Sequence, residues 1–383
     1  MRESLGDYKL LRRLAQGGMA DIYLGRRTGL AGFTKHVAIK VLSPERAEDP
    51  DSRALFLDEA RLAGLLEHEN IASVLDVDVD AGVHFLAMEY VHGADLRELL
   101  LHAQRRETSL PYEVSLAIVA AAADGLDHAH RRCLPDGTPL HLVHRDVSLS
   151  NLMVGYDGAV KVVDFGIAAS ALSRVTAAPG LVRGKAAYMS PEQCLGDALD
   201  RRTDVFALGV VLYELTTGAR CFDGATDFER MLAVVRGDYL PPHRLVPDYP
   251  RDLEAVVARA LAPIAADRFP TAAALVDALL GVATAHRWAL GASTIARTMR
   301  ALYGEVPEPW AMTDAEIAAA DAAARASAAA PEADAELSVT VRNVAVHSPR
   351  RLARGSVRFT RRGYALACDT RRACDSAGSS SAS

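Results

Sequence analysis

Short runs of alternating apolar and polar residues dominate the first part of the chain, a pattern typical of β-strands. These runs cover residues 8–15, 21–26, 71–79 and 83–91, and a further apolar run covers residues 37–39. Gly17-Gly18 and Ala81-Gly82 separate paired runs at the points where a hairpin needs a turn. Residues 56–62 instead have helical periodicity. We predict an N-terminal lobe of strands that contains one helix.

From Ala94 onward the pattern becomes helical. Residues 111–132 form a long alanine-rich apolar run with Pro111 near its first turn, where a missing N–H costs little. We expect its charged end, His128 to Arg132, to be exposed. A second run, from Asp204 through Tyr213, is almost continuously apolar, so we predict that it is the buried centre of a large helical lobe. The fold class is therefore α+β, with two lobes.

The last hundred or so residues change in character. Residues 284–303 are predicted to continue helically, with Ile295, Met299 and Leu302 as an apolar stripe that packs on the large lobe. A capping-box spacing at 313–316 opens an alanine-rich run that Pro331 ends. Residues 341–372 contain nine Arg, no Lys and one Asp, and the end is rich in Ser. Such a tail is typical of disorder, and its functional alternative is docking of an acidic partner or inhibition of the folded domain.

Composition excludes several classes of protein. Half of the 383 residues are apolar, enough for a large core, and the formal charge of −6 argues against a role in binding nucleic acid. The five Cys show no CxxC pattern, which indicates reduced thiols in a cytoplasmic protein. The polar start of the chain does not resemble a signal peptide. The apolar stretch 272–290 carries Asp277, His286 and Arg287, too many polar groups for a membrane span.

The strongest chemical pattern lies between the two predicted lobes. His144-Arg145-Asp146 is followed by a four-residue gap, Asn151 and, thirteen residues later, Asp164-Phe165-Gly166. Phosphoryl transfer needs one carboxylate to orient a hydroxyl and two oxygen ligands to hold Mg²⁺ on nucleotide phosphates. Asp146, Asn151 and Asp164 supply these three groups. We therefore predict Asp146 as a catalytic residue and Asn151 and Asp164 as metal ligands.

The N-terminal lobe supplies a matching pair of charges. Lys40 ends the apolar run 37–39, and Glu59 follows at the distance expected of strand, loop and helix. A lysine held by a glutamate points at the α and β phosphates of the nucleotide. Asp58 is adjacent but lies about 100° away around the helix. We predict that Lys40 pairs with Glu59.

With these motifs in order, residues from about 8 to about 281 resemble a serine/threonine protein kinase of the eukaryotic-like type found in bacteria. A P-loop enzyme is a weaker alternative because its G-x-x-x-x-G-K-[ST] motif is absent. Aminoglycoside phosphotransferases share the catalytic-loop spacing but lack the Ser190-Pro191-Glu192 motif. The resemblance implies transfer of the γ-phosphoryl of ATP to Ser or Thr of protein substrates, with Mg²⁺, in intracellular signalling.

The resemblance also assigns a nucleotide site. Its glycine-rich loop departs from G-x-G-x-x-G, because Ala15 and Ala20 replace the first and third glycines. Met88 is expected to border the adenine pocket, and the backbone of residues 89–91 to bond the base. The full predicted set is Leu14, Gly17, Gly18, Ile22, Ala38, Lys40, Met88, Glu89, Val91 and Met153.

The activation segment, by the same resemblance, runs from Asp164 to Glu192. Glu192 is expected to pair with a buried Arg268, and Asp204 to bond the backbone of the catalytic loop. Arg145 is expected to bind a phosphate on this segment, with Thr176 the first candidate acceptor and Ser173 and Ser170 the others. The alternative is that these hydroxyls only solvate the segment.

Two departures from the family concern charge. Ser148 stands where the catalytic-loop lysine is usual, and Lys185 stands where a threonine is usual. We predict that Lys185 returns the missing ammonium, which makes it a catalytic residue. The alternative is a nucleotide-binding pseudokinase that acts as a scaffold. Preference for Ser or Thr over Tyr follows from overall resemblance only. The predicted domains are 8–283, the kinase domain with lobes at about 8–91 and 92–283; 284–310, a helical extension on the large lobe; and 311–383, the tail.

Overall fold

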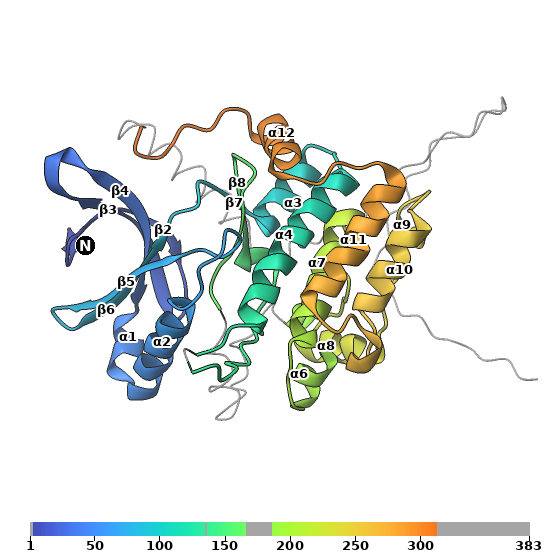
Figure 1. The fold of residues 1–383 in the computed structure, drawn as a ribbon, viewed down its shortest axis with the longest axis horizontal. Helices are drawn as coiled ribbons and strands as arrows, with labels where there is room; N and C mark the ends of the chain where they lie inside the picture. The colour runs from blue at the N-terminus through green and yellow to red at the C-terminus, as the bar shows by residue number, and fades with distance from the viewer. Residues whose placement is uncertain (1–2, 135, 166–185, 312–383) are drawn as a thin grey trace, which may run out of the picture. The chain divides into compact units, whose positions relative to one another are not determined.

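The computed structural model describes residues 3–134, 136–165 and 186–311, all within one unit of the chain, Met1–Val341. Its N-terminal lobe is a six-stranded antiparallel sheet in the order β1-β2-β3-β4-β6-β5 (Figure 1). The strands are β1 (Ser4–Leu5), β2 (Tyr8–Gln16), β3 (Ala20–Thr28), β4 (Thr34–Leu42), β5 (Val74–Asp80) and β6 (Val83–Glu89). A short 3-10 turn, Leu30–Gly32, lies between β3 and β4.

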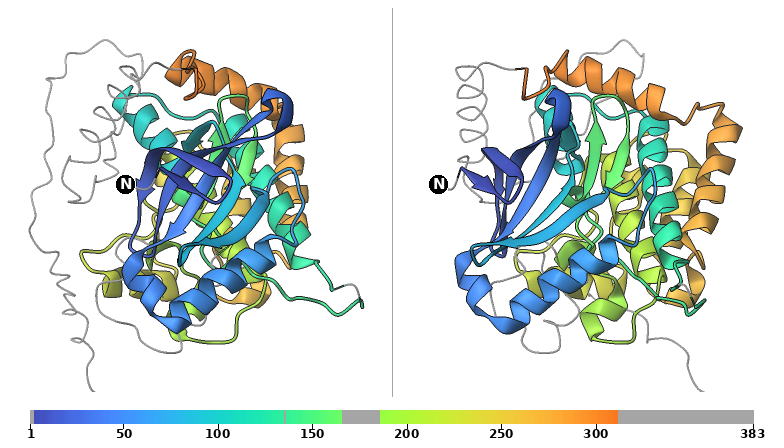
Figure 2. Two further views of the ribbon diagram at one scale, coloured as in Figure 1. Left: turned by 90° about the vertical axis from the view of Figure 1, so that its left-hand side faces the viewer. Right: turned by 60° about the vertical axis from the view of Figure 1, so that its left-hand side comes forward.

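Two helices, α1 (Pro44–Glu48) and α2 (Pro50–Ala63), follow β4 and lie beside the sheet (Figure 2). Asp49 caps α2 by accepting the N–H of Ser52 at 3.1 Å, and Pro50 takes the first helical position, where no N–H is needed. Phe56 and Ala60 of α2 are buried against β4 and β6. This packing fixes the rotation of α2, so that the neighbouring Glu59 is buried.

The C-terminal lobe combines a small sheet with a group of helices. The sheet is antiparallel and contains β7 (Gly93–Asp95), β8 (Leu152–Gly155) and β9 (Val160–Val162). The α-helices are α3 (Leu96–Arg105), α4 (Tyr112–His130), α6 (Pro191–Leu195), α7 (Arg202–Thr217), α8 (Asp227–Arg236), α9 (Pro242–Leu245), α10 (Arg251–Ala260), α11 (Ala272–His286) and α12 (Ala292–Tyr303). The 3-10 turns are Leu149–Asn151, Ala186–Tyr188 and Ala265–Asp267.

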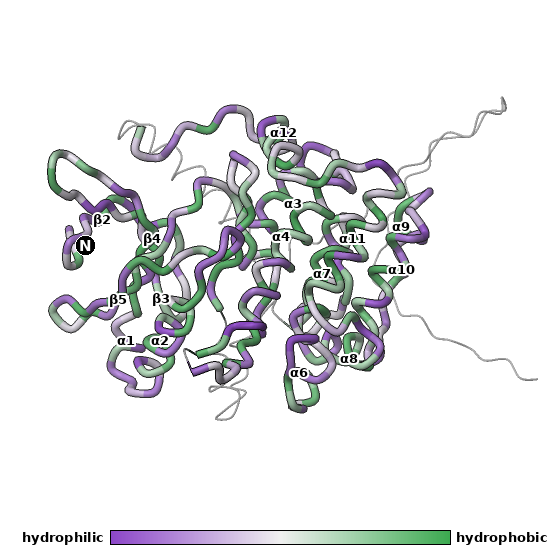
Figure 3. The backbone as a smooth tube through the Cα atoms, in the orientation of Figure 1, coloured by the Kyte–Doolittle hydropathy of each residue, from purple (hydrophilic) through white to green (hydrophobic). Residues whose placement is uncertain are grey.

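The core of this lobe is built around α4 and α7. Every residue of α7 from Thr203 to Thr216 is buried, which confirms the prediction from its apolar run. α4 packs against α7, α11 and α12. Figure 3 shows the largely hydrophobic course of α4, α7 and α11. The catalytic loop lies between α4 and β8 in the sequence, and its residues Val147 and Leu149 belong to the same core.

Three boundaries differ from the sequence expectations. β5 begins at Val74, not at residue 71, because residues 70–72 pair with β9: Ala72 N–H donates to Val162 O at 3.0 Å, and Val162 N–H donates to Asn70 O at 2.8 Å. The helix expected over 111–132 is shorter at both ends, and Pro111 is its N-cap residue. The expectation of an exposed charged end is wrong for His130, whose side chain is 1% exposed because it contacts Asp204.

The helix expected to continue over 284–303 is broken. α11 ends at His286, Arg287 takes a left-handed φ of 58°, and Trp288 N–H returns to Ala283 O at 2.9 Å. These are the bonds of a Schellman-type C-cap. The predicted stripe of α12 is buried nevertheless, since Ile295, Met299 and Leu302 belong to the core of the C-terminal lobe.

Residues 304–311 leave α12 and reach the N-terminal lobe, a contact that packing on the large lobe alone did not include (Figures 1 and 2). Trp310 stacks on His36 of β4, with ring centroids 4.0 Å apart and planes 2° from parallel. Its ring also meets Tyr90 edge-on at 5.9 Å. Within the described residues, the structure contains no helix with the length and apolar content to cross a bilayer.

Candidate active site

Lys40 lies at the centre of a charged contact between the two lobes. Its Nζ is 2.9 Å from Glu59 Oε1 on α2 and 2.9 Å from Asp164 Oδ1, and its side chain is 12% exposed. Burial alone would lower the pKa of Lys40, but the carboxylates of Asp164 and Glu59 outweigh it and hold the pKa above its usual value. The ammonium is therefore charged at neutral pH. The predicted Lys40–Glu59 pair is present, and Asp58 is exposed.

Asp204 of α7 binds the backbone of the catalytic loop. Its carboxylate oxygens accept the N–H groups of His144 at 2.8 Å and Arg145 at 2.9 Å, which confirms the contact predicted for Asp204. His130 Nε2 donates to the same carboxylate at 2.7 Å. Burial would raise the pKa of Asp204, but the His130 hydrogen bond and nearby imidazoles lower it. The carboxylate thus stays ionised and accepts three bonds.

His144 connects the catalytic loop to the strand before Asp164, a role that the sequence analysis missed. Its Nδ1 accepts the N–H of Asp146 at 3.2 Å, so Nε2 carries the proton and donates to Val163 O at 3.1 Å. The buried ring also packs on Phe165, with centroids 4.7 Å apart. One imidazole therefore fixes the spacing between Asp146 and the Asp164 segment. The sequence could have indicated this role, because His144 is the first residue of the His144-Arg145-Asp146 motif.

Asn151 fixes the carboxylate of Asp146, the predicted catalytic residue, directly. Its Nδ2 donates to Asp146 O at 2.7 Å and to Asp146 Oδ2 at 2.9 Å. Both bonds use the amide nitrogen, so the amide oxygen remains as a ligand atom. Asp164 adds carboxylate oxygens, and its left-handed φ of 53° turns the chain directly after β9 and Val163. A hard cation such as Mg²⁺ prefers such oxygen ligands, and the donor set fits it.

The segment after the activation loop is anchored by a buried ion pair. Arg268 Nη1 and Nη2 donate to the two carboxylate oxygens of Glu192 at 2.7 and 2.8 Å, which confirms the predicted pair. Arg268 also donates to the carbonyl oxygens of Ala262, Pro263 and Arg202. All of the guanidinium nitrogens are satisfied, so this buried charge is compensated.

The predicted nucleotide residues come from five strands and two loops. In the sheet register, Ile22 faces Lys40, and Ala38 faces Met88. Gly17 lies in a tight turn: a Cβ there would come 2.8 Å from Ala20 O, whereas Gly18 has open space around it. The remaining residues are Leu14 on β2, Glu89 at the end of β6, Val91 just after it and Met153 on β8.

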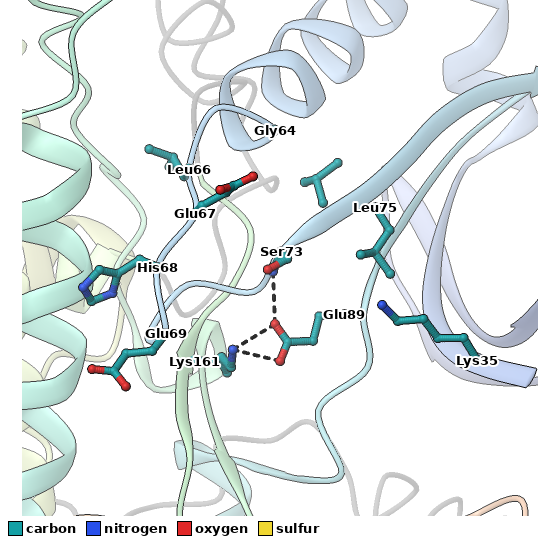
Figure 4. Close-up of a pocket in the computed structure, with 11 residues that line it drawn as sticks. Lys35, Gly64, Leu66, Glu67, His68, Glu69, Ser73, Leu75, Glu89 and Lys161 are labelled. Atoms are coloured by element: carbon teal, nitrogen blue, oxygen red, sulfur yellow. Dashed lines mark hydrogen bonds and ion pairs between the residues drawn. The ribbon is translucent and has the colours of Figure 1, made fainter.

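Glu89 makes three polar contacts with Ser73 and Lys161, and these restrict how it can bind a base. Its own N–H donates to Ser73 O at 2.9 Å, so only its carbonyl is left for adenine. Its carboxylate accepts from Ser73 N at 3.2 Å and Lys161 Nζ at 2.9 Å (Figure 4). Of the predicted nucleotide residues, only Glu89 lines the pocket of Figure 4, so this pocket is not the predicted nucleotide site.

Of the two residues at which charge differs from the family pattern, the structure describes Ser148 and not Lys185. Ser148 is buried, and within the part of the chain that the structure describes its hydroxyl oxygen has no hydrogen-bond partner. Lys185, Gly166 and the candidate phosphate acceptors Thr176, Ser173 and Ser170 lie outside the described residues. The replacement of the lysine by Lys185 therefore stays a prediction.

Comparison with known proteins agrees with this geometry. The model of the protein kinase domain matches residues 8–294, and the chain belongs to the protein kinase family. The chain is similar to the kinase domain of PknI from Mycobacterium tuberculosis, seen in a crystal structure of its C20A mutant: the TM-score is 0.56 and the identity 31%, over 74% of this chain and 99% of that one. The predicted family and the predicted bilobal α+β fold are confirmed.

Two curated relatives are kinases of bacteria. The tyrosine-protein kinase MasK of Myxococcus xanthus is 42% identical over 300 residues, which cover 78% of this chain and 46% of the relative. The serine/threonine-protein kinase PknB of Mycobacterium leprae is 37% identical over 280 residues, which cover 72% of this chain and 43% of the relative. The chain thus spans less than half the length of these relatives.

Proposed function

We propose that this chain is an ATP-dependent protein kinase that phosphorylates Ser or Thr of protein substrates in cytoplasmic signalling. The contact of Lys40 with both Glu59 and Asp164 carries the proposal, because it joins the β4 strand, α2 and the metal-binding segment at one ammonium. A scaffold that only exposes surfaces has no need for this arrangement. The intact contact favours an enzyme over the pseudokinase alternative.

Each residue has a distinct task in this proposal. Asp146 orients the substrate hydroxyl and accepts its proton, and Asn151 holds the Asp146 carboxylate with its amide nitrogen at 2.9 Å. Lys40 places the phosphates, held by Glu59. Asn151 Oδ1 and Asp164 would hold Mg²⁺, which neutralises charge on the phosphate oxygens when bound.

The acceptor hydroxyl is the finer part of the proposal. PknB is named a serine/threonine kinase and MasK a tyrosine kinase, so the printed names of the relatives support both types. Ser148 and Lys185 occupy positions where residues linked to this choice usually lie. We favour Ser and Thr, and analysis of the phosphorylated amino acids in the assay below distinguishes the two.

The domain assignment is proposed with the function. We assign residues 8–283 to the kinase domain, 284–310 to an extension and 311–383 to a tail. The tail is proposed to dock an acidic partner or the kinase domain itself, because of its nine Arg in residues 341–372.

Incubation with radiolabelled ATP and Mg²⁺ tests the function. We expect the wild-type chain to incorporate phosphate into itself or a generic protein substrate, and Asp146→Asn to reduce turnover by about 10²- to 10⁴-fold. The substitution keeps the size of the side chain and removes only the proton acceptor. An inactive wild-type protein that still binds ATP would overturn the proposal in favour of the scaffold.

A further inference from the structure

The side chain of Gln193 forms bonds at two separate places. It is the third residue of α6, directly after the Ser190-Pro191-Glu192 motif. Its side-chain Oε1 accepts the backbone N–H of Ser190 at 2.9 Å, and the backbone N–H of Gln193 donates to Ser190 Oγ at 3.4 Å. These two bonds form a capping box. The cap uses only the amide oxygen. The amide nitrogen donates instead to Arg145 O, 48 positions earlier in the chain, at 2.8 Å.

Arg145 is the residue directly before Asp146, and its backbone is strained. Its φ is 68°, in the left-handed region, which a non-glycine residue occupies only when its surroundings enforce it. Asp204 accepts its N–H at 2.9 Å, and Gln193 donates to its carbonyl at 2.8 Å. The strained residue is thus held at both ends, by α7 on one side and by α6 on the other.

The contact from Gln193 depends on the position of α6, and α6 is fixed by a separate ion pair. Glu192, one residue before Gln193, is fixed by two bonds to the buried Arg268. The position of the Gln193 amide therefore follows the position of the helix that ends the activation segment. A shift of α6 would release the Arg145 carbonyl while the Asp204 contact stayed intact.

We propose that Gln193 is a positioning residue for Asp146, through which α6 must be docked before the catalytic loop takes its working geometry. The inference rests on the proposed kinase activity, and it adds a residue that acts through Arg145 without touching substrate. On this inference, turnover requires that α6 is docked. Nucleotide binding does not, because Lys40, Glu59 and the glycine turn belong to the N-terminal lobe.

The substitution Gln193→Glu separates the two tasks of the side chain. Glutamate has the same shape and is the other common residue at this position of a capping box, so one carboxylate oxygen still accepts from Ser190 N–H. The second oxygen replaces the donor and faces Arg145 O without a proton. We expect kcat to fall by about ten- to a hundredfold, with little change in the KM for ATP and in the melting temperature.

Ser190→Ala is the matched control. It removes the Oγ acceptor of the cap but leaves Ser190 N–H and the bond from Gln193 to Arg145. We expect a lower melting temperature with kcat close to that of wild type. The pH dependence gives a second signature: at low pH the carboxyl introduced by Gln193→Glu is protonated and donates again, so its kcat deficit relative to wild type should shrink.

Hydrogen exchange decides the inference independently of activity. Peptides that cover residues 143–151 should exchange faster in Gln193→Glu than in wild type or Ser190→Ala, because the Arg145 carbonyl has lost its donor. Unchanged exchange there overturns the inference, as does an unchanged kcat in an active protein. A wild type without transferase activity would contradict the proposed function, and the exchange result would still show whether Gln193 holds the loop.

Discussion

Asp204 organises the residues next to Asp146, the predicted catalytic carboxylate. Three donors converge on it: the N–H groups of His144 and Arg145 and the ring of His130. The bonds from one loop and one helix end both terminate on a carboxylate that α7 holds in the core. The geometry of Asp146 therefore depends on residues that never approach the substrate.

Some of these residues were predictable from the sequence, and others were not. Lys40, Glu59 and Asp204 were found because short motifs place them at known spacings. His130 was expected to be exposed because it lies in a charged cluster, and only the partner on α7, 74 positions away, buries it. Gln193 carried a readable signal in the Ser190-x-x-Gln193 capping box, but its bond to Arg145 depends on tertiary packing.

The ammonium at Lys185 is testable by substitution. Because the buried Ser148 brings no charge to the position of the usual lysine, we expect Lys185→Ala to lower turnover by about 10²-fold or more while ATP binding stays intact. Lys35→Ala, which removes one charge from an exposed position on β4, is the control and should stay active. Turnover of Lys185→Ala close to that of wild type would refute the relocation.

Glu214 on α7 gives a prediction for stability against pH. Burial raises the pKa of Glu214 from 4.5 to about 7, although Tyr188 Oη donates to it at 2.6 Å and Cys221 N at 3.2 Å. Between these two pH values the folded state holds a proton that the unfolded state has released. The free energy of unfolding therefore falls as pH rises through this window, by roughly 3 kcal/mol, and levels off above pH 7.

Urea unfolding between pH 5 and pH 8 measures this effect. Glu214→Gln cannot ionise, so its free energy of unfolding should lack this decline, whatever its absolute stability. The difference between the two proteins is the informative quantity, because other titrating groups are common to both. Parallel curves for wild type and Glu214→Gln would contradict the assignment.

At the scale of elements, hydrophobic patterning predicted the strands and the central helices well. The patterning failed at positions where backbone hydrogen bonds, and not side-chain burial, determine where a strand or helix ends. Residues 71 and 72 begin the predicted strand pattern, yet residues 70–72 pair with β9 and so connect the α2–β5 segment to the strand before Asp164. The break after α11 depends on the left-handed Arg287, a residue type that gives no warning of this conformation.

The same pairing explains how the lobes are connected near the site. β9 is bonded on one edge to β8 of the C-terminal lobe, and Val162 bonds residues 70 and 72 of the N-terminal lobe. Lys161 on β9 also reaches Glu89 at 2.8 Å, close to the predicted base-binding backbone. One short strand therefore links the segment between α2 and β5, the end of β6 and Asp164, and these lie next to the proposed phosphate and base contacts.

At the scale of the whole molecule, Trp310 adds a further connection between the lobes, beyond the residues 8–294 that match the family. It follows α12 of the C-terminal lobe and contacts His36 and Tyr90, the latter between the predicted base-binding residues Glu89 and Val91. Trp310 is 39% exposed, so much of its surface is removed from water. The segment after α12 thus restrains the lobes next to the predicted adenine contacts.

Trp310→Ala should therefore affect nucleotide affinity as well as stability. We expect the free energy of unfolding to fall by about 1–2 kcal/mol and the KM for ATP to rise a few-fold. Trp288→Ala is the matched control, since Trp288 contacts Tyr112 and His286 within the C-terminal lobe. It should lower stability without changing the KM for ATP. Urea unfolding and initial-rate kinetics of both variants measure the difference, and equal KM values for the two variants would show that Trp310 does not restrain the lobes.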